Sequence, residues 1–448
     1  MTTPPHPEPP ATGIDADRAL DRSGYRHFLT ARAVSWAGSA VSLVALPLLI
    51  YQRSGSAALT GLLTALEAIP YLLLGLPAGA WADRLDPRRV LVASNLASCL
   101  LLASIPLANM IDALTTMQLL IVAAGNAAAL TFSDAAGFRA LAALVPPGAM
   151  GQATGRMSSV STVIALAGPA AGGLLAATVG AGPALSVDAA SFAASALLMA
   201  RLPPHSPTAR PVRRPLRADI GEGLRWVWEH RLVRTLTLIG LGNSLTAGFV
   251  TGLIVVVAVR RLGLPDDDGR IGLLYAAAGA GSLTASLLIA PLQRRFPVGW
   301  LTLGGLAAGL VFLGWWAVST ALIPGALALL AWQAANTTVS LNGIVVRQTV
   351  APIELQGRVN TTARIIAWGG QPIGAAVGGL TAQHTGLGHA LALAGSGLTI
   401  SLAAGSLTRL RDPHRLAALA VAAPASRTRV PTEQAETSHS EKPGFAKP

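Results

Sequence analysis

The chain has 448 residues, of which 52% are hydrophobic and only 12% are charged. Soluble domains carry about 25% charged residues, so this composition excludes an ordinary water-soluble protein. The net charge of +12 comes from short arginine clusters between apolar stretches, and no continuous basic face of the kind that binds nucleic acid is present. With Cys99 as its single cysteine, the chain has no disulfide framework, and we predict neither a metal nor another cofactor.

Apolar runs of about 20 residues, long enough to cross about 30 Å of hydrocarbon, recur along the chain. Six precede a polar interval and six follow it, which predicts an all-α membrane protein with twelve transmembrane helices in two pseudo-symmetric six-helix bundles. The predicted spans are 28–51, 59–81, 90–110, 114–132, 158–179, 183–202, 236–259, 271–292, 298–319, 322–346, 359–382 and 387–407.

These spans divide the chain into an N-terminal segment, a bundle, a linker, a second bundle and a tail. The predicted boundaries are 1–27, 28–202, 203–234, 235–410 and 411–448. The tail is rich in small and polar residues and contains no apolar run of spanning length, so we expect it to be disordered and cytoplasmic.

The second part of the linker predicts an amphipathic helix. Its expected apolar face consists of Ile220, Leu224, Val227 and Trp228. Such a helix would lie on the inner leaflet of the membrane or would brace the two bundles against each other.

Basic residues are unevenly distributed over the short loops. One set of alternate loops contains most of the arginines, and the opposite set contains only Arg53, Arg260, Arg261 and Arg270. Because basic loops are retained in the cytoplasm, both termini are predicted to be cytoplasmic in a multi-pass protein of the inner or plasma membrane.

The loop after the second span reads GAWADRLDPRRVL and contains Gly79, Asp83, Arg84 and Arg88. It resembles the signature loop G-x-L-A-D-R-x-G-R-[RK]-x-x-L of the major facilitator superfamily, although Asp86 replaces a glycine and Pro87 an arginine. Glycine allows helices to approach closely, and the charged groups can pair at helix ends, so this loop is a candidate gating motif. A positive-inside hairpin without a gating role is the alternative.

The fifth span contains GPAAGG, formed around Gly168, Pro169, Gly172 and Gly173. It resembles the G-P-x-x-G-G motif that is typical of proton-coupled antiporters in that superfamily. Proline bends a helix and glycine permits tight packing, which suits a helix that rocks. Plain helix packing is the alternative, because glycine is common in membrane helices.

Two further stretches are similar to one branch of the superfamily: ALSVDAASFAASALL in the sixth span and EGLRWVWEHRLVRTL after the linker. That branch, sometimes called transmembrane secretion effectors, includes drug, macrolide and siderophore exporters such as enterobactin exporters. The resemblance covers residues 26–411. It implies the major facilitator fold and alternating access by rocking of one bundle against the other.

Few ionisable residues fall within the predicted spans, where a charge costs about 2.5–3.5 kcal/mol at the bilayer centre. The candidates for proton coupling are Glu67, Asp134, Asp188 and Arg32. Glu67 leads because it lies near the middle of its span. Burial favours a protonated carboxyl group and a nearby cation favours the ionised form, so conformation could control the proton. A structural role is the alternative for each candidate.

In this superfamily the first, fourth, seventh and tenth helices line a central cavity. The resemblance therefore implies a substrate cavity with these polar residues: Ser42, Asn126, Asn243, Ser244, Gln333, Asn336 and Thr337. Neutral polar groups in an apolar wall favour amphipathic substrates. Hydrogen bonding between helices is the alternative role for each of them.

The predicted function is secondary active export of small amphipathic molecules of drug, antibiotic or siderophore type, by proton antiport. An uptake symporter or uniporter of the same fold is the alternative, and a membrane enzyme or non-transporting protein is a further one. No Gly-x-x-x-x-Gly-Lys loop is present, which argues against ATP as the energy source. We predict no catalytic residue. The expected partners are substrate, protons and the lipid bilayer but no nucleic acid, and a monomer is expected.

Overall fold

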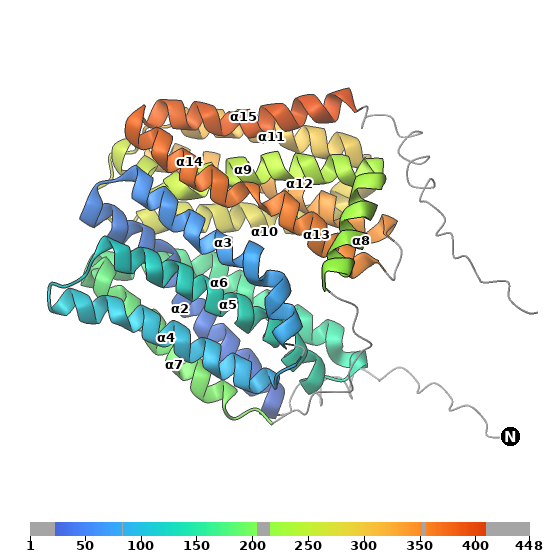
Figure 1. Cartoon of the computed structure of the whole chain (residues 1–448). Helices are drawn as coiled ribbons and strands as arrows, with labels where there is room; N and C mark the ends of the chain where they lie inside the picture. Colours follow the sequence, from blue (N-terminus) through green and yellow to red (C-terminus); the bar gives the residue numbers. More distant parts are fainter. Residues whose placement is uncertain (1–22, 83, 204–215, 352–354, 409–448) are drawn as a thin grey trace, which may run out of the picture.

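The computed structural model describes residues 23–82, 84–203, 216–351 and 355–408, which form helices joined by short turns (Figure 1). Most of the predicted N-terminal segment, the first part of the linker, the C-terminal tail and Asp83 lie outside the described residues. Eleven of the described helices are long and apolar enough to cross a membrane.

The N-terminal half of the chain contributes the first six of these helices. They are α2 (Ser23–Ser54), α3 (Ala57–Ala82), α4 (Pro87–Met110), α5 (Thr116–Leu144), α6 (Met150–Val179) and α7 (Ala181–Met199). A single 3-10 turn, η1 (Pro147–Ala149), joins α5 to α6. Both helices extend beyond the apolar runs predicted as the fourth and fifth spans, because their polar ends continue as helix outside the apolar segment.

The C-terminal half begins with the short helix α8 (Leu216–Glu229). The helices that follow are α9 (Arg231–Arg260), α10 (Ile271–Arg295), α11 (Val298–Val318), α12 (Leu322–Val350), α13 (Gln356–Trp368), α14 (Gly370–His384) and α15 (Leu387–Leu407).

The predicted eleventh span, 359–382, is divided into two helices in the structure. It consists of α13 and α14, which meet at Gly369. Pro372 has no N–H with which to bond the carbonyl of Trp368 in the usual helical pattern. The Gly369 N–H keeps the ordinary helical hydrogen bond to the carbonyl of Ile365 (3.0 Å) and also lies 3.3 Å from that of Ile366. The described residues therefore form eleven continuous spans and one broken one.

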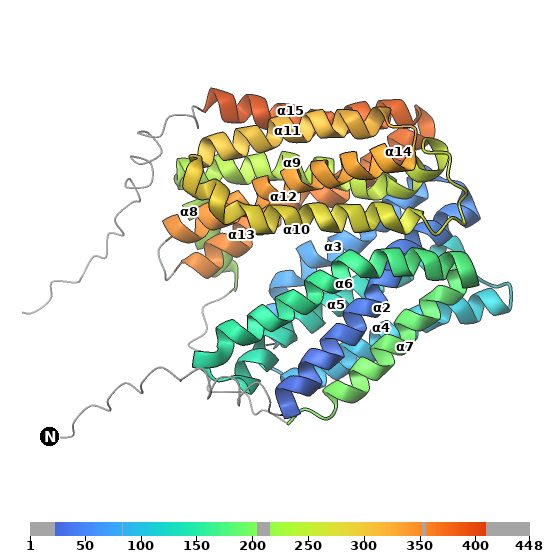
Figure 2. The ribbon, with the colours of Figure 1, turned by 180° about the vertical axis from the view of Figure 1, so that it is seen from behind.

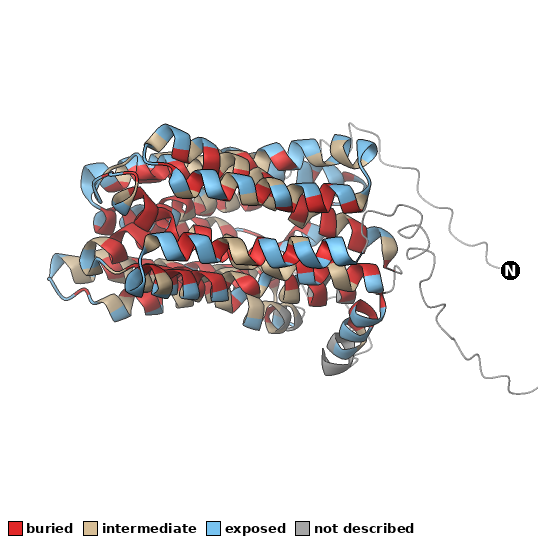
Figure 3. Ribbon diagram, turned by 90° about the horizontal axis from the view of Figure 1, so that it is seen from above, coloured by how far each residue is buried: buried red, intermediate tan, exposed pale blue. Residues whose placement is uncertain are grey.

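The outer surface of the helix bundle is apolar. Leu100 is 72% exposed, and Leu287 and Val311 are each 68% exposed, while the buried residues lie on the inward faces of the helices (Figure 3). Exposure of these apolar side chains to water would be unfavourable in free energy, whereas contact with the hydrocarbon of a bilayer is not. Backbone hydrogen bonds within each helix satisfy the polar groups that lipid cannot. The chain is therefore a multi-pass membrane protein.

The two halves meet where glycines face each other. The main contacts between them are α3 with α14 and α6 with α10. A Cβ atom added to Gly61 of α3 would lie 2.8 Å from the Cα atom of Gly379, and one added to Gly173 of α6 would lie 2.8 Å from the Cα atom of Gly272. The backbones can approach this closely only because these positions have no side chain.

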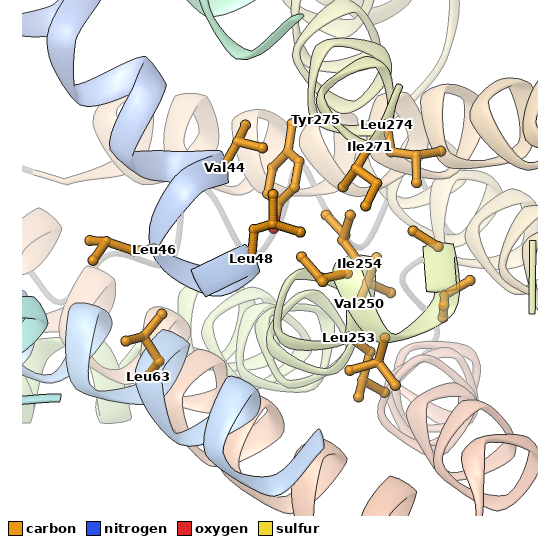
Figure 4. Packing of buried hydrophobic residues seen from close by; sticks show 14 of the residues in the cluster. Val44, Leu46, Leu48, Leu63, Val250, Leu253, Ile254, Ile271, Leu274 and Tyr275 are labelled. Carbon is orange, nitrogen blue, oxygen red and sulfur yellow. The ribbon is translucent and has the colours of Figure 1, made fainter. Parts of the chain in front are cut away.

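Hydrogen bonds and an apolar plug reinforce this contact at one end of the molecule, here named the closed end. The Arg260 Nε donates to the hydroxyl of Tyr51 (3.0 Å), and the backbone N–H of Ala57 donates to the Oε1 of Gln383 (2.9 Å). Val44 and Leu48 of α2 join Ile254 and Tyr275 in one buried cluster (Figure 4). Towards the opposite end, here named the α8 end, the helices of the two halves diverge (Figure 2).

The turn before α10 carries a local ion pair at the closed end. The Arg270 guanidinium donates to both carboxylate oxygens of Asp268, at 2.6–3.0 Å. These hydrogen bonds hold the pKa of Asp268 below its usual value. The pair flanks Gly269, whose added Cβ would lie 3.1 Å from the carbonyl oxygen of Gly173, so it fixes a turn that packs against α6.

Helix α8 lies across the ends of the C-terminal helices, and its main contacts are with α13 and α9 (Figure 1). It therefore packs mainly on the C-terminal half of the molecule. Val227 is fully buried with Trp226 against residues of α13. Leu224 is 42% exposed and Trp228 is 47% exposed. The residues predicted to share one apolar face therefore differ in burial, because neighbouring helices cover Val227 but leave Leu224 and Trp228 partly exposed. The side chain of Ile220 is not described.

Substituting Gly173 should open the closed end. Gly173→Val places a branched side chain against the α10 backbone, and we expect a steric cost of about 1–3 kcal/mol in this arrangement. In a Cys99→Ser background, Leu48→Cys should then react faster with a membrane-impermeant maleimide. Gly314→Val is the matched control, since a Cβ atom at Gly314 meets nothing within 4 Å. Equal labelling in both variants would contradict the assigned contact.

Candidate transport site

A cavity of about 480 Å³ lies between the two halves. Helices α2, α3 and α6 form one side, and α9, α10 and α12 form the other. Its wall is largely apolar, with Leu43, Ile164 and Ile254 among its residues, and neutral polar groups are interspersed. The closed end seals this cavity on one side, so it can hold an amphipathic molecule between the halves.

Glu67 is the only carboxylate among the described residues that line this cavity. Thr64 and Glu67 lie one turn apart on α3 and face the same space, opposite Tyr275 and Gln333 from the C-terminal half. No hydrogen bond or ion pair joins the Glu67 carboxylate to another described residue. An ionisable group placed in this way is free to exchange a proton with the cavity.

Asp188 lies in a different environment. It is fully buried between α7 and α2, and its carboxylate accepts hydrogen bonds from the hydroxyls of Ser42 and Ser191. Gly38 makes room for this group, since a Cβ atom at Gly38 would lie 2.5 Å from the Asp188 Oδ1. Ser42 therefore bonds to Asp188 and is not among the residues that line the cavity. Both side chains join helices of the same half.

Arg32 and Asp134 form an ion pair at the α8 end of the N-terminal half. The Arg32 Nη2 lies 2.7 Å from the Asp134 Oδ1, and the guanidinium also lies over the Trp36 ring, 4.9 Å from its centroid. The charge of Asp134 is thus compensated by α2, whereas that of Glu67 is not.

Most of the predicted cavity residues line a second cavity of about 310 Å³, within the C-terminal half. It is formed by α9, α12 and the junction of α13 with α14. The predicted residues on its wall are Asn243, Ser244, Gln333, Asn336 and Thr337. Gln333 and Thr251 line both cavities. Asn126 lines neither of them, and its Oδ1 is buried without a partner in the described chain.

The signature loop starts α4. Asp86 caps this helix by accepting a hydrogen bond from the Arg88 N–H (3.0 Å), and Pro87 occupies its first position. A capping carboxylate followed by proline is a favoured helix start, which explains both departures from the family pattern.

The structure describes three of the four candidate gating residues of this loop, Gly79, Arg84 and Arg88. The Arg88 guanidinium donates to the Ala200 carbonyl at the end of α7, within the same half. Arg84 is exposed. A Cβ atom at Gly79 would meet nothing within 4 Å, so close helix approach at Gly79, which we expected, is absent from this structure. Asp83 lies outside the described residues.

The GPAAGG segment places α6 between α2 and the opposite half. A Cβ atom at Gly172 would lie 2.8 Å from the Cα atom of Val41 on α2, whereas Gly173 faces Gly272 of α10. Pro169 lines the cavity between the halves. The motif therefore gives α6 two tight faces and one face towards the cavity.

Sequence reasoning missed several residues of the site, among them Tyr275 in the cavity between the halves and Arg347 in the second cavity. It also missed one face of α2, where the cavity is lined by Trp36, Ser39, Ala40, Leu43 and Pro47. Their spacing of three, four, seven and eleven residues from the first is the signal of one helical face, and Ser42 falls outside it. No comparable signal marks Tyr275, because its position depends on packing between distant helices.

The comparisons with known proteins agree with this geometry. The family model described as Major Facilitator Superfamily matches residues 28–375. The protein named multidrug efflux pump Tap from Mycolicibacterium fortuitum is 28% identical over 404 residues, covering 86% of this chain and 95% of that protein. Its namesake from Mycobacterium tuberculosis (strain ATCC 25618 / H37Rv) is 29% identical over 403 residues, covering 86% and 92%.

Solved transporter structures share the fold. A bacterial homologue of the iron transporter ferroportin, in an inward-facing state, superposes with a TM-score of 0.68 at 15% identity, covering 88% of this chain and 98% of that one. The nucleoside transporter NupG gives a TM-score of 0.68 at 13% identity, covering 85% and 98%.

Asp188 and Glu67 should respond differently to removal of the carboxylate. Asp188→Ala deprives the buried Ser42 hydroxyl of its acceptor and leaves a void, while Ser191 keeps its bond to the backbone carbonyl of residue 188, so we expect a loss of about 1–3 kcal/mol in unfolding free energy. Glu67→Ala, at a cavity wall, should change it by less than about 0.5 kcal/mol. The stability of both variants is measured by thermal unfolding in detergent, which is monitored through the reaction of a thiol-reactive dye with Cys99. Equal destabilisation would contradict the assigned environments.

Proposed function

Because the chain belongs to the Major Facilitator Superfamily, we propose that it exports small amphipathic molecules by alternating access, in exchange for protons. The observation that carries this proposal is the largely apolar cavity between the halves, with Glu67 on its wall. This chain matches 95% and 92% of the length of the two relatives named multidrug efflux pump. That similarity supports export of this substrate class.

The proposed orientation places the α8 end in the cytoplasm of a cell whose inner or plasma membrane holds the protein. Arg84, Arg88, Arg294 and Arg295 belong to loops or helix ends on this side, and basic residues are retained in the cytoplasm. Both termini would then be cytoplasmic, and the structure would correspond to a state closed towards the outside. A monomer suffices for this cycle, because both halves come from one chain.

Glu67 is the proposed proton carrier. Asp134 is paired with Arg32, and Asp188 is held by two hydroxyls inside one half. Of these three carboxylates, only Glu67 lines the cavity between the two halves. A carboxyl group in an apolar cavity favours the protonated form, and access to water favours release of the proton. Rocking of the halves would therefore couple proton movement to the exposure of bound substrate.

Transport in proteoliposomes tests the proposed function. With an imposed pH gradient, a panel of amphipathic antibiotics, dyes and siderophores should contain compounds that move opposite to the proton gradient, and collapsing the gradient should stop their accumulation. Accumulation in the same direction as protons would indicate an uptake symporter. Transport that is indifferent to the gradient would indicate a uniporter.

Glu67→Gln tests the proton carrier. The amide cannot release a proton at neutral pH, so gradient-driven export should fall to the background level while exchange of labelled for unlabelled substrate persists. Asp134→Asn serves as the matched control, because it also neutralises a carboxylate on the N-terminal half, and it should retain coupling. Coupled export by Glu67→Gln at the unsubstituted rate would remove Glu67 from the mechanism.

A further inference from the structure

The second cavity, within the C-terminal half, contains a buried cation. Arg347 of α12 is 4% exposed and lines this cavity. Its Nη1 lies 3.5 Å from the position that a Cβ atom on Gly343 would occupy. The side chain therefore turns back along α12 by one helical turn, away from the end of the helix and towards the membrane interior.

No partner neutralises this guanidinium within the described chain. Its Nε is buried without a hydrogen-bond acceptor, and no ion pair or side-chain hydrogen bond joins Arg347 to another described residue. None of the described residues on the cavity wall is a carboxylate. Burying an unpaired arginine is costly, so the position suggests an anion that is bound for part of the working cycle.

Neutral groups near Arg347 complete the lining. The Asn243 Nδ2 donates to the Asn336 carbonyl (3.1 Å) and to the Ser340 hydroxyl (3.2 Å), which fixes that amide. The Oδ1 atoms of Asn243 and Asn336 remain buried without partners in the described part of the chain. These amide oxygens can accept hydrogen bonds only from donor groups of a ligand, so Arg347 is the one cation among the described residues of the cavity wall that can neutralise an anionic group.

We propose that this cavity is a subsite for a carboxylate group carried by transported molecules, and that Arg347 binds that carboxylate. The planar guanidinium matches a carboxylate with two parallel hydrogen bonds. Thr251 and Gln333 belong to both cavities, so the two cavities adjoin, and a substrate long enough to extend along α12 can place its carboxylate near Arg347 and its apolar body between the halves. The inference rests on the proposed function and narrows it to amphipathic carboxylic acids among the substrates.

Dansylglycine and its methyl ester form a matched pair of probes, since they differ chiefly in the negative charge. Energy transfer to the dansyl group from the nine tryptophans, of which Trp368 lines this cavity, reports binding to the full-length protein in detergent, and the Arg347 variants assign that binding to the cavity. The unsubstituted protein should bind the acid more tightly than the ester. Arg347→Gln should weaken binding of the acid by about tenfold or more, as loss of a charged hydrogen bond does, and should leave binding of the ester unchanged.

Two further variants keep the test decisive. Arg347→Lys retains the charge and should keep a reduced preference for the acid. Asn243→Asp leaves Arg347 in place but adds a carboxylate to the wall, and it should also weaken binding of the acid. Arg295→Gln is the control, because it removes an exposed arginine from the end of α10, and it should change neither affinity.

Equal affinities for acid and ester in the unsubstituted protein, or an equal loss of both in Arg347→Gln, would overturn the subsite. Export of other amphipathic compounds would persist in that case, and the proposed function would stand. Conversely, charge-dependent binding without any gradient-driven export would support the subsite and overturn the proposed export.

Discussion

Contact between helix backbones at the closed end is the constraint on which the rest of the structure depends. Glycines at positions 61, 173, 272 and 379 allow α3 to meet α14 and α6 to meet α10 without intervening side chains. The apolar cluster around Leu48 and Tyr275 then excludes water from the same end. Because the helices touch there and diverge towards the α8 end, a cavity remains between the halves.

The distribution of charge follows from this arrangement. Where helices of one half pack together, buried charges have partners, as Arg32 has in Asp134 and Asp188 has in Ser42 and Ser191. Where side chains face the cavities, Glu67 on one side and Arg347 on the other lack partners among the described residues. Unpaired charges are costly in a membrane, and this cost is the reason why we propose a proton as the ligand of Glu67 and a carboxylate as the ligand of Arg347.

Periodicity and motif spacing predicted much of the fold. Apolar runs identified the eleven helices of the described chain that are long enough to span a membrane. The GPAAGG motif identified α6, which packs closely against both α2 and α10. The break at Gly369 was not predicted, because apolar composition continues through it and the effect of Pro372 is local. Ser42 shows the limit for the site: one residue along a helix rotates a side chain by about 100°, from the cavity to Asp188. The ion pair between Arg32 and Asp134 could not be predicted from the sequence, because its prediction requires knowledge of which helices are neighbours.

Distances at both ends of the α6 and α10 helices test alternating access most directly. In a Cys99→Ser background, spin labels at Val179→Cys and Asp267→Cys report on the closed end, and labels at Ser159→Cys and Ser286→Cys report on the α8 end. Lowering the pH or adding substrate should lengthen one distance while the other shortens, because the halves rock as rigid bodies. Distances that change together, or that stay fixed under every condition, would contradict the account.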